Sequence, residues 1–237
     1  MKKKSDLSDL FLEKIKYIGI TIGLIMLMLT WSAIPSIILI ILNINIESIP
    51  NIIKILYTFI FDIIFLLLIA SIYKQEITKE FKVFFTKKNI LNNIKKSLKY
   101  WSIGMIIMIS TNAIIALFTN NLAANEQAVR EMIDKYPLYM AFQVMIYAPI
   151  SEEIIFRKSI DKIFKNKYLY ILISGLIFGG LHVISSITSL IDILYLLPYC
   201  SLGFVFALLY KNTNNNIFST ITAHAFHNTL ALLLYLL

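Results

Sequence analysis

Residues 17–42 read YIGITIGLIMLMLTWSAIPSIILIIL, a run of 26 residues without Asp, Glu, Lys or Arg. A helix needs about 20 predominantly apolar residues to cross the hydrocarbon core of a bilayer. The run is longer than the apolar part of a cleavable signal peptide, which is about 7–15 residues, and no A-x-A cleavage site follows it. We therefore expect a retained first membrane span, in which Pro35 is tolerated as a kink.

The rest of the chain follows the same pattern. Of its 237 residues, 58% are hydrophobic and 15% are charged, whereas a soluble domain carries about 25% charged residues. The composition predicts an all-α, polytopic transmembrane helix bundle. Seven runs are long enough to cross the membrane, and we place them at residues 17–42, 55–73, 100–118, 138–156, 168–188, 191–210 and 217–236.

The Lys and Arg residues between these runs indicate the orientation. With a cytoplasmic N-terminus, 19 of them lie on the cytoplasmic side and 3 lie outside, as the positive-inside rule requires. We expect an integral protein of a bacterial plasma membrane with an external C-terminus. The net charge of +8 belongs to these connections, so we expect membrane lipid and not nucleic acid as a partner. The single cysteine, Cys200, excludes an intrachain disulfide.

Two connections carry features of their own. Residues 74–99 contain eight lysines, with apolar residues at helical spacing: Ile77, Phe81, Phe84, Leu91, Ile94 and Leu98. This pattern predicts one or two helices on the anionic cytoplasmic leaflet, the alternative being an ordinary solvated connector. The acidic-leaning connection 119–137 is predicted to be helical around Glu126 to Ile133 and to lie outside.

Charged and polar residues inside apolar helices are costly and by default indicate a functional site. The first such group is Glu152-Glu153-x-x-x-Arg157. Glu153 and Arg157 are four residues apart, hence neighbours on one helix face, whereas Glu152 points about 100° away. We expect Glu153 to pair with Arg157, and Glu152 to face a cavity on a turn opened by Pro149. The alternative is a pair of charges snorkelling at the cytoplasmic helix end.

A second group is Phe178-x-x-x-His182. Gly175 and Gly179 form a small-xxx-small face, which lets another helix approach closely. His182 lies one turn further along that face, so we expect it in a helix–helix interface. A histidine there can also be merely a satisfied hydrogen-bonding group.

The third group is His224-x-x-x-Asn228, two residues one above the other on a helix. This spacing suits two donors aimed at one oxygen, or a pair of ligands. His227 is about 60° from His224 around the helix, and we assign it a supporting or structural role. The chain contains no His-Glu-x-x-His and no G-x-S-x-G. A carboxylate with one histidine can activate water, and the second histidine with Asn228 can hold an oxyanion.

The order and spacing of these three groups resemble the CPBP family of intramembrane proteases, also called the CAAX-protease, bacteriocin-processing or Abi family. The strings Ala148-Pro149-Ile150-Ser151-Glu152-Glu153 and Thr222-Ala223-His224-Ala225 are also similar to its motif contexts. The resemblance covers about residues 138–230. It implies two parts: residues 1–137, with N-terminal transmembrane helices and a basic membrane-surface helix, and residues 138–237, a catalytic helical core with the active site between its helices.

The resemblance also implies roles for the residues. Glu152 would be the general base, His182 would orient the attacking water, and His224 with Asn228 would stabilise the oxyanion. Glu153 and Arg157 would form a structural ion pair, and Phe178 and His227 would support the histidines. We prefer a mechanism that requires no cofactor. Zinc or another divalent metal stays open, because Glu152, His182 and His224 are also a possible ligand set.

The leading hypothesis is an endopeptidase that cleaves a peptide in the cytoplasmic half of the membrane. Because the chain is rich in Ile, Asn and Lys, we expect an AT-rich bacterium, in which prenylated CAAX substrates are not expected. Peptide or bacteriocin maturation, or self-immunity, is therefore preferred. The alternative is a non-catalytic immunity or scaffold protein that binds a peptide in the same cavity. A transporter is disfavoured because the two halves of the sequence do not mirror each other.

Overall fold

The computed structural model describes residues 2–184, 187 and 190–237, and their regular elements are all helical. The expected all-α fold is thus confirmed for this part of the chain. Two compact units can be distinguished, Met1–Lys74 and Gln75–Leu237. These units describe packing alone, so the division between residues 137 and 138 stays a prediction. The second unit joins residues 75–137 to the helices that carry the three polar groups.

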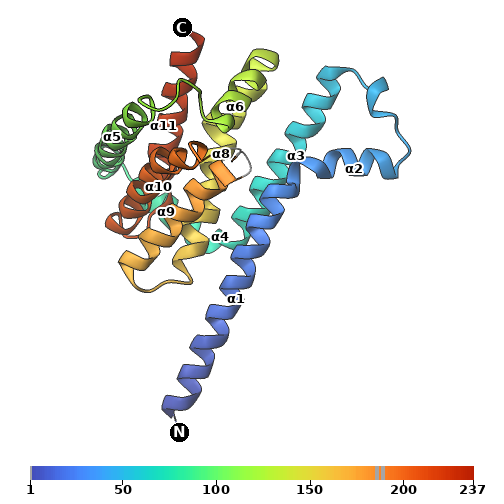
Figure 1. The fold of residues 1–237 in the computed structure, drawn as a ribbon. Helices are drawn as coiled ribbons and strands as arrows, with labels where there is room; N and C mark the ends of the chain where they lie inside the picture. Colours follow the sequence, from blue (N-terminus) through green and yellow to red (C-terminus); the bar gives the residue numbers. More distant parts are fainter. Residues whose placement is uncertain (1, 185–186, 188–189) are drawn as a thin grey trace. The chain divides into compact units, whose positions relative to one another are not determined.

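The first unit consists of three helices joined by two short 3₁₀ turns. They are α1 (Lys2–Thr30), η1 (Trp31–Ala33), α2 (Ile34–Ile41), η2 (Ile46–Ser48) and α3 (Asn51–Ile72). The chain bends sharply between α1 and α2 (Figure 1), and Pro35 lies in the first turn of α2. The predicted kink is therefore confirmed, because proline fits the first turn of a helix and not its interior. The Trp31 indole Nε1 donates to the Phe61 carbonyl oxygen over 3.1 Å, which joins the bend to α3.

The second unit contains the remaining helices. They are α4 (Lys74–Phe84), α5 (Ile90–Ile115), α6 (Ala124–Lys135), α7 (Pro137–Phe142), η3 (Gln143–Tyr147), α8 (Ala148–Glu153), η4 (Ile154–Ser159), α9 (Lys167–Val183), η6 (Asp192–Tyr195), α10 (Leu196–Asn212) and α11 (Ile217–Leu236). η3 and η4 are π-helical, and η6 is a 3₁₀ helix. α10 packs against α9, α5 and α11 and is more buried than α5 and α11.

Five helices in the described residues are long and apolar enough to cross a membrane: Phe11–Ile41, Asn51–Ile72, Ile90–Ile115, Asp192–Asn212 and Ile217–Leu236. The expected number of seven is not confirmed. The run 138–156 is divided among α7, η3, α8 and η4. For the run 168–188, α9 ends at Val183 after 17 residues, or about 26 Å of rise, and residues 185, 186 and 188 lie outside the described residues.

Two glycines bring α9 and α10 into backbone contact. A Cβ atom added to Gly175 would lie 2.9 Å from the backbone nitrogen of Phe204, and one added to Gly179 would lie 2.7 Å from that of Cys200. Such distances leave no room for a side chain. The predicted small-residue interface is therefore confirmed, and its partner is α10.

The segment 74–99 forms one separate helix and the start of another, since α5 already begins at Ile90. α4 also has polar partners: Lys158 pairs with Glu80 and Glu76, and Lys162 pairs with Glu76. Burial raises the pKa of the Glu76 carboxyl group, but the two lysines outweigh it and lower that pKa below its ordinary value. Glu80 Oε2 also accepts from the Ile217 N–H, at the N-terminus of α11. α4 is therefore bound to the helical core rather than only to a lipid surface.

The polar connections between the helices have conformations that suit their residues. α6 covers residues 124–135 and confirms the helix expected around Glu126 to Ile133. Asn214 and Asn215 both have positive φ angles, a conformation that asparagine tolerates better than most residues. Asn216 then caps α11, its side-chain oxygen accepting from the Phe218 N–H over 3.0 Å. The result is a tight polar loop between α10 and α11.

Candidate active site

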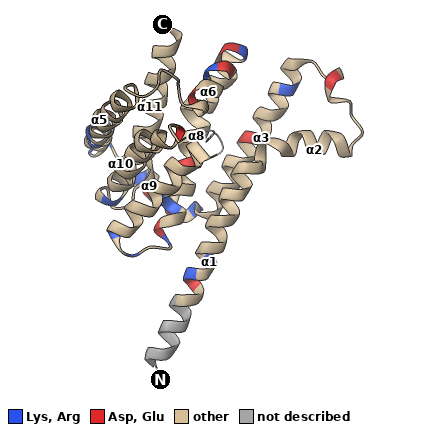
Figure 2. Ribbon diagram, viewed as in Figure 1, with Lys and Arg blue, Asp and Glu red and all other residues tan. Residues whose placement is uncertain are grey.

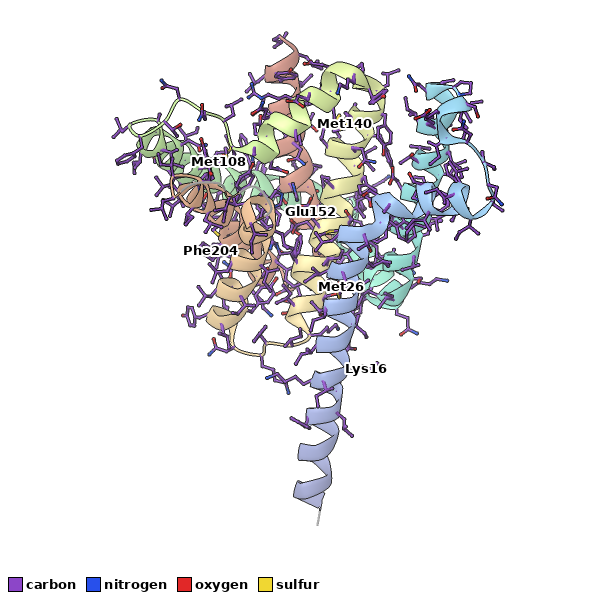
Figure 3. All side chains as sticks on the ribbon, turned by 45° about the vertical axis from the view of Figure 1, so that its right-hand side comes forward. Lys16, Met26, Met108, Met140, Glu152 and Phe204 are labelled. Atoms are coloured by element: carbon purple, nitrogen blue, oxygen red, sulfur yellow. The ribbon has the colours of Figure 1, made fainter. Side chains whose placement is uncertain are left out.

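The two adjacent glutamates lie on a helical run of unusual geometry. α8 carries Glu152 and Glu153 between the π-helical segments η3 and η4, and Glu152 lies about midway along the run (Figure 3). π-helical segments are rare and frequently occur at functional sites. The two carboxylates therefore lie on a short α-helical segment with a π-helical segment on each side.

Pro149 contributes to this irregularity and to one contact across the site. The Ala148 N–H donates to the Gln143 carbonyl oxygen in the π register. The next donor in that register would be residue 149, and proline has no N–H. The Val144 carbonyl oxygen instead accepts from Asn228 Nδ2 over 2.8 Å. Asn228 thus ties α11 to η3, and the second hydrogen of its amide group is available to another acceptor.

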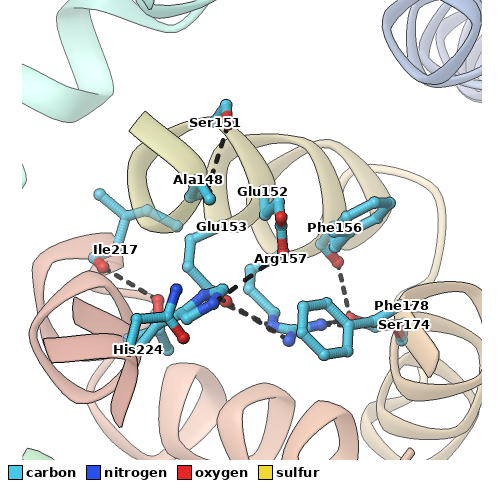
Figure 4. A network of polar contacts seen from close by, with 12 residues as sticks. Ala148, Ser151, Glu152, Glu153, Phe156, Arg157, Ser174, Phe178, Ile217 and His224 are labelled. Atoms are coloured by element: carbon cyan, nitrogen blue, oxygen red, sulfur yellow. Dashed lines mark hydrogen bonds and ion pairs between the residues drawn. The ribbon is translucent and has the colours of Figure 1, made fainter. Parts of the chain in front are cut away.

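Glu153 and Arg157 form an ion pair in the protein interior. Arg157 Nε lies 2.9 Å from Glu153 Oε2, and both side chains are fully buried. The guanidinium group also donates to Ser174 Oγ over 2.8 Å and lies 4.9 Å from the centre of the Phe178 ring. These contacts compensate the buried charge of Arg157 (Figure 4). They also hold the run 137–159 against α9.

The second oxygen of Glu153 binds His224. His224 Nδ1 lies 3.0 Å from Glu153 Oε1. Because a carboxylate only accepts hydrogen bonds, the Nδ1 atom carries the hydrogen. The Nε2 atom of His224 is then directed towards Glu152, 4.0 Å from its Oε2 atom. Glu153 therefore orients a histidine as well as neutralising Arg157.

His182 is oriented in the same manner by a different acceptor. Its Nδ1 atom lies 2.8 Å from the Phe178 carbonyl oxygen, so it too carries the hydrogen on Nδ1. His182 Nε2 lies 3.8 Å from Glu152 Oε2. The Phe178 ring lies 4.6 Å from the ring of His182 and 5.8 Å from that of His224, centre to centre. Phe178 thus separates and supports the two histidines.

Glu152 is the group on which both histidines converge. Its Oε2 atom is buried and has no hydrogen-bond partner among the described residues. An unpartnered buried carboxylate oxygen is costly, and such atoms in native proteins commonly bind water or a ligand. The structure thus brings Glu152, His182 and His224 together from α8, α9 and α11, three elements far apart in the sequence.

These side chains line the inner part of a cavity of about 710 Å³. Asn228, His227 and Phe178 also line it. Apolar residues form much of the remaining wall: Met108, Ile115, Ile133, Val144, Leu202, Phe206 and Leu232. Such a volume suits a ligand of several residues, since small-molecule sites are usually about 300–1,000 Å³.

Two aromatic residues of α10 were not identified from the sequence. The Tyr199 ring stacks on His182 at 4.9 Å and an interplanar angle of 23°. The Phe206 ring lies 5.6 Å from that of His224. Their spacing of seven residues is compatible with one helix face. However, α10 is apolar on all sides, so its sequence does not indicate which face meets the histidines.

The three converging residues have the chemistry of a zinc ligand set, two imidazoles and one carboxylate. Around zinc with bonds of about 2.0–2.1 Å, tetrahedral donors are roughly 3.3–3.4 Å apart. Here the Oε2–Nε2 separations are 3.8 and 4.0 Å. No group of three or more His, Cys, Asp and Glu side chains in residues 2–184, 187 and 190–237 is arranged to hold a metal ion. The residues as placed do not form a metal cage, so the steps below use only the chain's own groups.

Comparison with known proteins finds one family to which the part of the chain that carries these residues is similar. Residues 134–230 match the family described as "Type II CAAX prenyl endopeptidase Rce1-like". The "Putative membrane peptidase YdiL" of Bacillus subtilis (strain 168) is 34% identical over 167 residues, which are 63% of this chain and 63% of YdiL. Residues 134–230 are thus similar to the Rce1-like family. The matched residues include every member of the three polar groups, so the expected resemblance is confirmed.

Two other relatives extend the comparison. An "Uncharacterized protein" of Mycoplasma capricolum is 32% identical over 105 residues, 43% of this chain and 30% of the relative. The "UPF0177 protein YxdF" of Lactococcus lactis is 28% identical over 141 residues, 56% of this chain and 76% of the relative. The chain thus spans less than two thirds of YdiL and of the Mycoplasma protein. No solved structure matches the chain.

Proposed function

We propose that this protein is a membrane endopeptidase that hydrolyses a peptide bond with a water molecule activated by Glu152. The observation that carries the proposal is the buried, unpartnered Oε2 atom of Glu152, 3.8 and 4.0 Å from two histidine Nε2 atoms. A water molecule between these atoms could donate to the carboxylate and to one imidazole. The Rce1-like family and the name of the YdiL relative support a peptidase.

The first chemical step transfers one proton. Glu152 removes a proton from the water as its oxygen attacks the carbonyl carbon of the substrate. His182, with its hydrogen on Nδ1, offers the Nε2 lone pair to the same water and orients it. The products of this step are a protonated Glu152 and a tetrahedral intermediate with a negatively charged oxygen.

The second step needs donors for that oxygen. Since His224 Nδ1 is bonded to Glu153, His224 can donate from Nε2 only as the imidazolium ion. The Glu153 carboxylate 3.0 Å away provides a counter-charge for this form. The free N–H of Asn228 is the second candidate donor. When the C–N bond breaks, Glu152 returns its proton to the leaving amine, which balances the reaction.

The substrate that we propose is a peptide or a membrane-protein segment with apolar side chains. The support is the apolar part of the cavity wall, since Val144, Leu202 and Phe206 line the same cavity as Glu152. In the cell, maturation of a peptide or bacteriocin, or self-immunity, remains the proposed role. A neighbouring reading frame that encodes a small peptide with a double-glycine leader would support it.

The test compares two glutamates. Glu152→Gln and the matched control Glu131→Gln, on the exposed surface of α6, are purified in lipid nanodiscs and mixed with synthetic apolar peptides. Mass spectrometry measures cleavage and peptide crosslinking measures binding. We expect Glu152→Gln to lose about 10²–10⁴-fold in rate, and Glu131→Gln to match the unmodified protein. Equal cleavage by Glu152→Gln overturns the mechanism, and binding without cleavage by every variant favours the non-catalytic alternative.

A further inference from the structure

The two ends of the second unit differ in charge. Residues 75–99 and 157–167 together with Lys211 contain thirteen Lys and Arg residues, whereas residues 119–137 contain two. The same stretch also contains the acidic residues Glu126, Glu131 and Asp134, which lie on α6 (Figure 2). The positive-inside rule predicts that the basic side is cytoplasmic.

Contacts show that the basic segments meet at one end of the unit, which we call the basic end. Lys96, on α5, donates to the Asn212 carbonyl oxygen at the end of α10. Lys167, at the start of α9, donates to the side chain of the same Asn212 over 2.7 Å. Lys211 pairs with Asp161, just beyond η4. The start of α5, the end of η4, the start of α9 and the end of α10 are therefore close together.

The opposite end, which we call the α6 end, is held by a separate set of contacts. The Tyr195 hydroxyl, at the start of the α10 region, donates to the Asn121 carbonyl oxygen. Asn125 Nδ2, on α6, lies 3.4 Å from the Tyr199 hydroxyl. The Tyr235 hydroxyl, near the end of α11, donates to Asp134 over 2.9 Å. α10 and α11 therefore reach the basic end with one terminus and the α6 end with the other.

The cavity extends from Glu152 towards the α6 end. Its lining includes Thr119, Asn120, Asn121, Leu122 and Ala123 of the connection, Asn125, Glu126 and Arg130 of α6, and Tyr235 of α11. The lining contains no residue from 75–99, 157–167 or 211–217. Several of these residues at the α6 end are exposed and polar, so they form the mouth of the cavity.

We propose that the cavity takes its substrate from the extracytoplasmic side of the membrane. The substrate class is then an exported peptide, or a membrane-protein segment that emerges on the outer side. The identity of the ligand as a substrate rests on the proposed peptidase function. The orientation of the cavity does not depend on that function. From the sequence alone we expected cleavage in the cytoplasmic half of the membrane. Arg157 is fully buried in an ion pair, and no residue from 157–167 lines the cavity.

Cysteine accessibility tests the proposal in cells. In a Cys200→Ala background, single cysteines are placed at Ala231, which lines the cavity, and at Leu233, which does not and is 52% exposed. These positions are close in depth but point to nearly opposite sides of α11. Intact cells are treated with a sulfonated methanethiosulfonate that does not cross membranes. Thiols that remain after denaturation are counted with a fluorescent maleimide.

We expect Ala231→Cys to be modified in intact cells at least about tenfold faster than Leu233→Cys, since a thiol facing lipid does not ionise readily. Lys165→Cys, at the basic end, should react only after permeabilisation. Asn112→Cys, on the α5 wall of the cavity, provides the same measurement if the Ala231 variant does not fold. Cavity cysteines that react only after permeabilisation, or Lys165→Cys that reacts in intact cells, overturn the proposal. Because labelling requires no catalysis, an inactive enzyme leaves this result valid, and a failed orientation leaves the role of Glu152 untouched.

Discussion

Replacing Glu153 by Gln should destabilise the protein far more than its small change in shape suggests. The substitution keeps the volume of the side chain and can keep the hydrogen bond to His224 Nδ1. It removes the negative charge that lies 2.9 Å from Arg157 Nε in a fully buried pair. Arg157 then remains in the interior without a counter-ion.

The magnitude follows from the geometry. Two unit charges about 4 Å apart interact by about 4 kcal/mol at an effective dielectric constant of about 20. Breaking a buried pair by removing one partner costs about 3–5 kcal/mol. Arg157 retains Ser174 Oγ at 2.8 Å and the Phe178 ring at 4.9 Å. We therefore expect the lower part of that range, about 3 kcal/mol, or roughly a hundredfold in the unfolding equilibrium.

The assay is reversible unfolding in detergent micelles, followed by circular dichroism. Glu126→Gln is the matched control, because Glu126 pairs with Arg130 at the same spacing and at 2.8 Å, with side chains 42% and 38% exposed. It should lose less than about 1 kcal/mol, since exposed pairs contribute little. The double variant Glu153→Gln/Arg157→Met should regain much of the loss, because it removes the unpaired charge. Equal losses for Glu153→Gln and Glu126→Gln, or no recovery in the double variant, would refute the reasoning.

Two further predictions concern the chemistry. Asn228→Ala should lower the cleavage rate by about 10²–10³-fold if the amide holds the oxyanion, and also destabilise the fold by about 1–3 kcal/mol by leaving the Val144 carbonyl oxygen unpaired; an unchanged rate in a folded Asn228→Ala protein contradicts the donor role. Chelation of divalent metals should leave cleavage unchanged, as measured in nanodiscs with metal analysis of the purified protein. Stoichiometric zinc whose removal abolishes turnover, with recovery on zinc addition alone, would replace the metal-free mechanism by one in which Glu152, His182 and His224 are ligands.

Local features of the fold could be predicted because they depend on near neighbours in the chain. Apolar runs without charges indicate helices whatever they pack against, and Pro35 interrupts its helix because of its own ring. The pairing of Glu153 with Arg157 needs only the helical offset of four residues. Gly175 and Gly179 likewise indicate a close helix contact, although not that α10 makes it. The count of spans was harder to predict, because the run 138–156 contains π-helical segments and α9 ends after 17 residues.

The amino-acid sequence by itself determined the helical class, the membrane character, the family motifs and the side chains that carry the chemistry. Only the tertiary structure decided that His182 and His224 direct their Nε2 atoms at one oxygen of Glu152, that α4 binds the start of α11, and that the cavity opens at the α6 end. The physical reason is the separation along the sequence of the residues that interact. Helix periodicity and hydropathy are properties of adjacent residues, whereas the convergence of α8, α9 and α11 depends on how side chains distant in the sequence pack together.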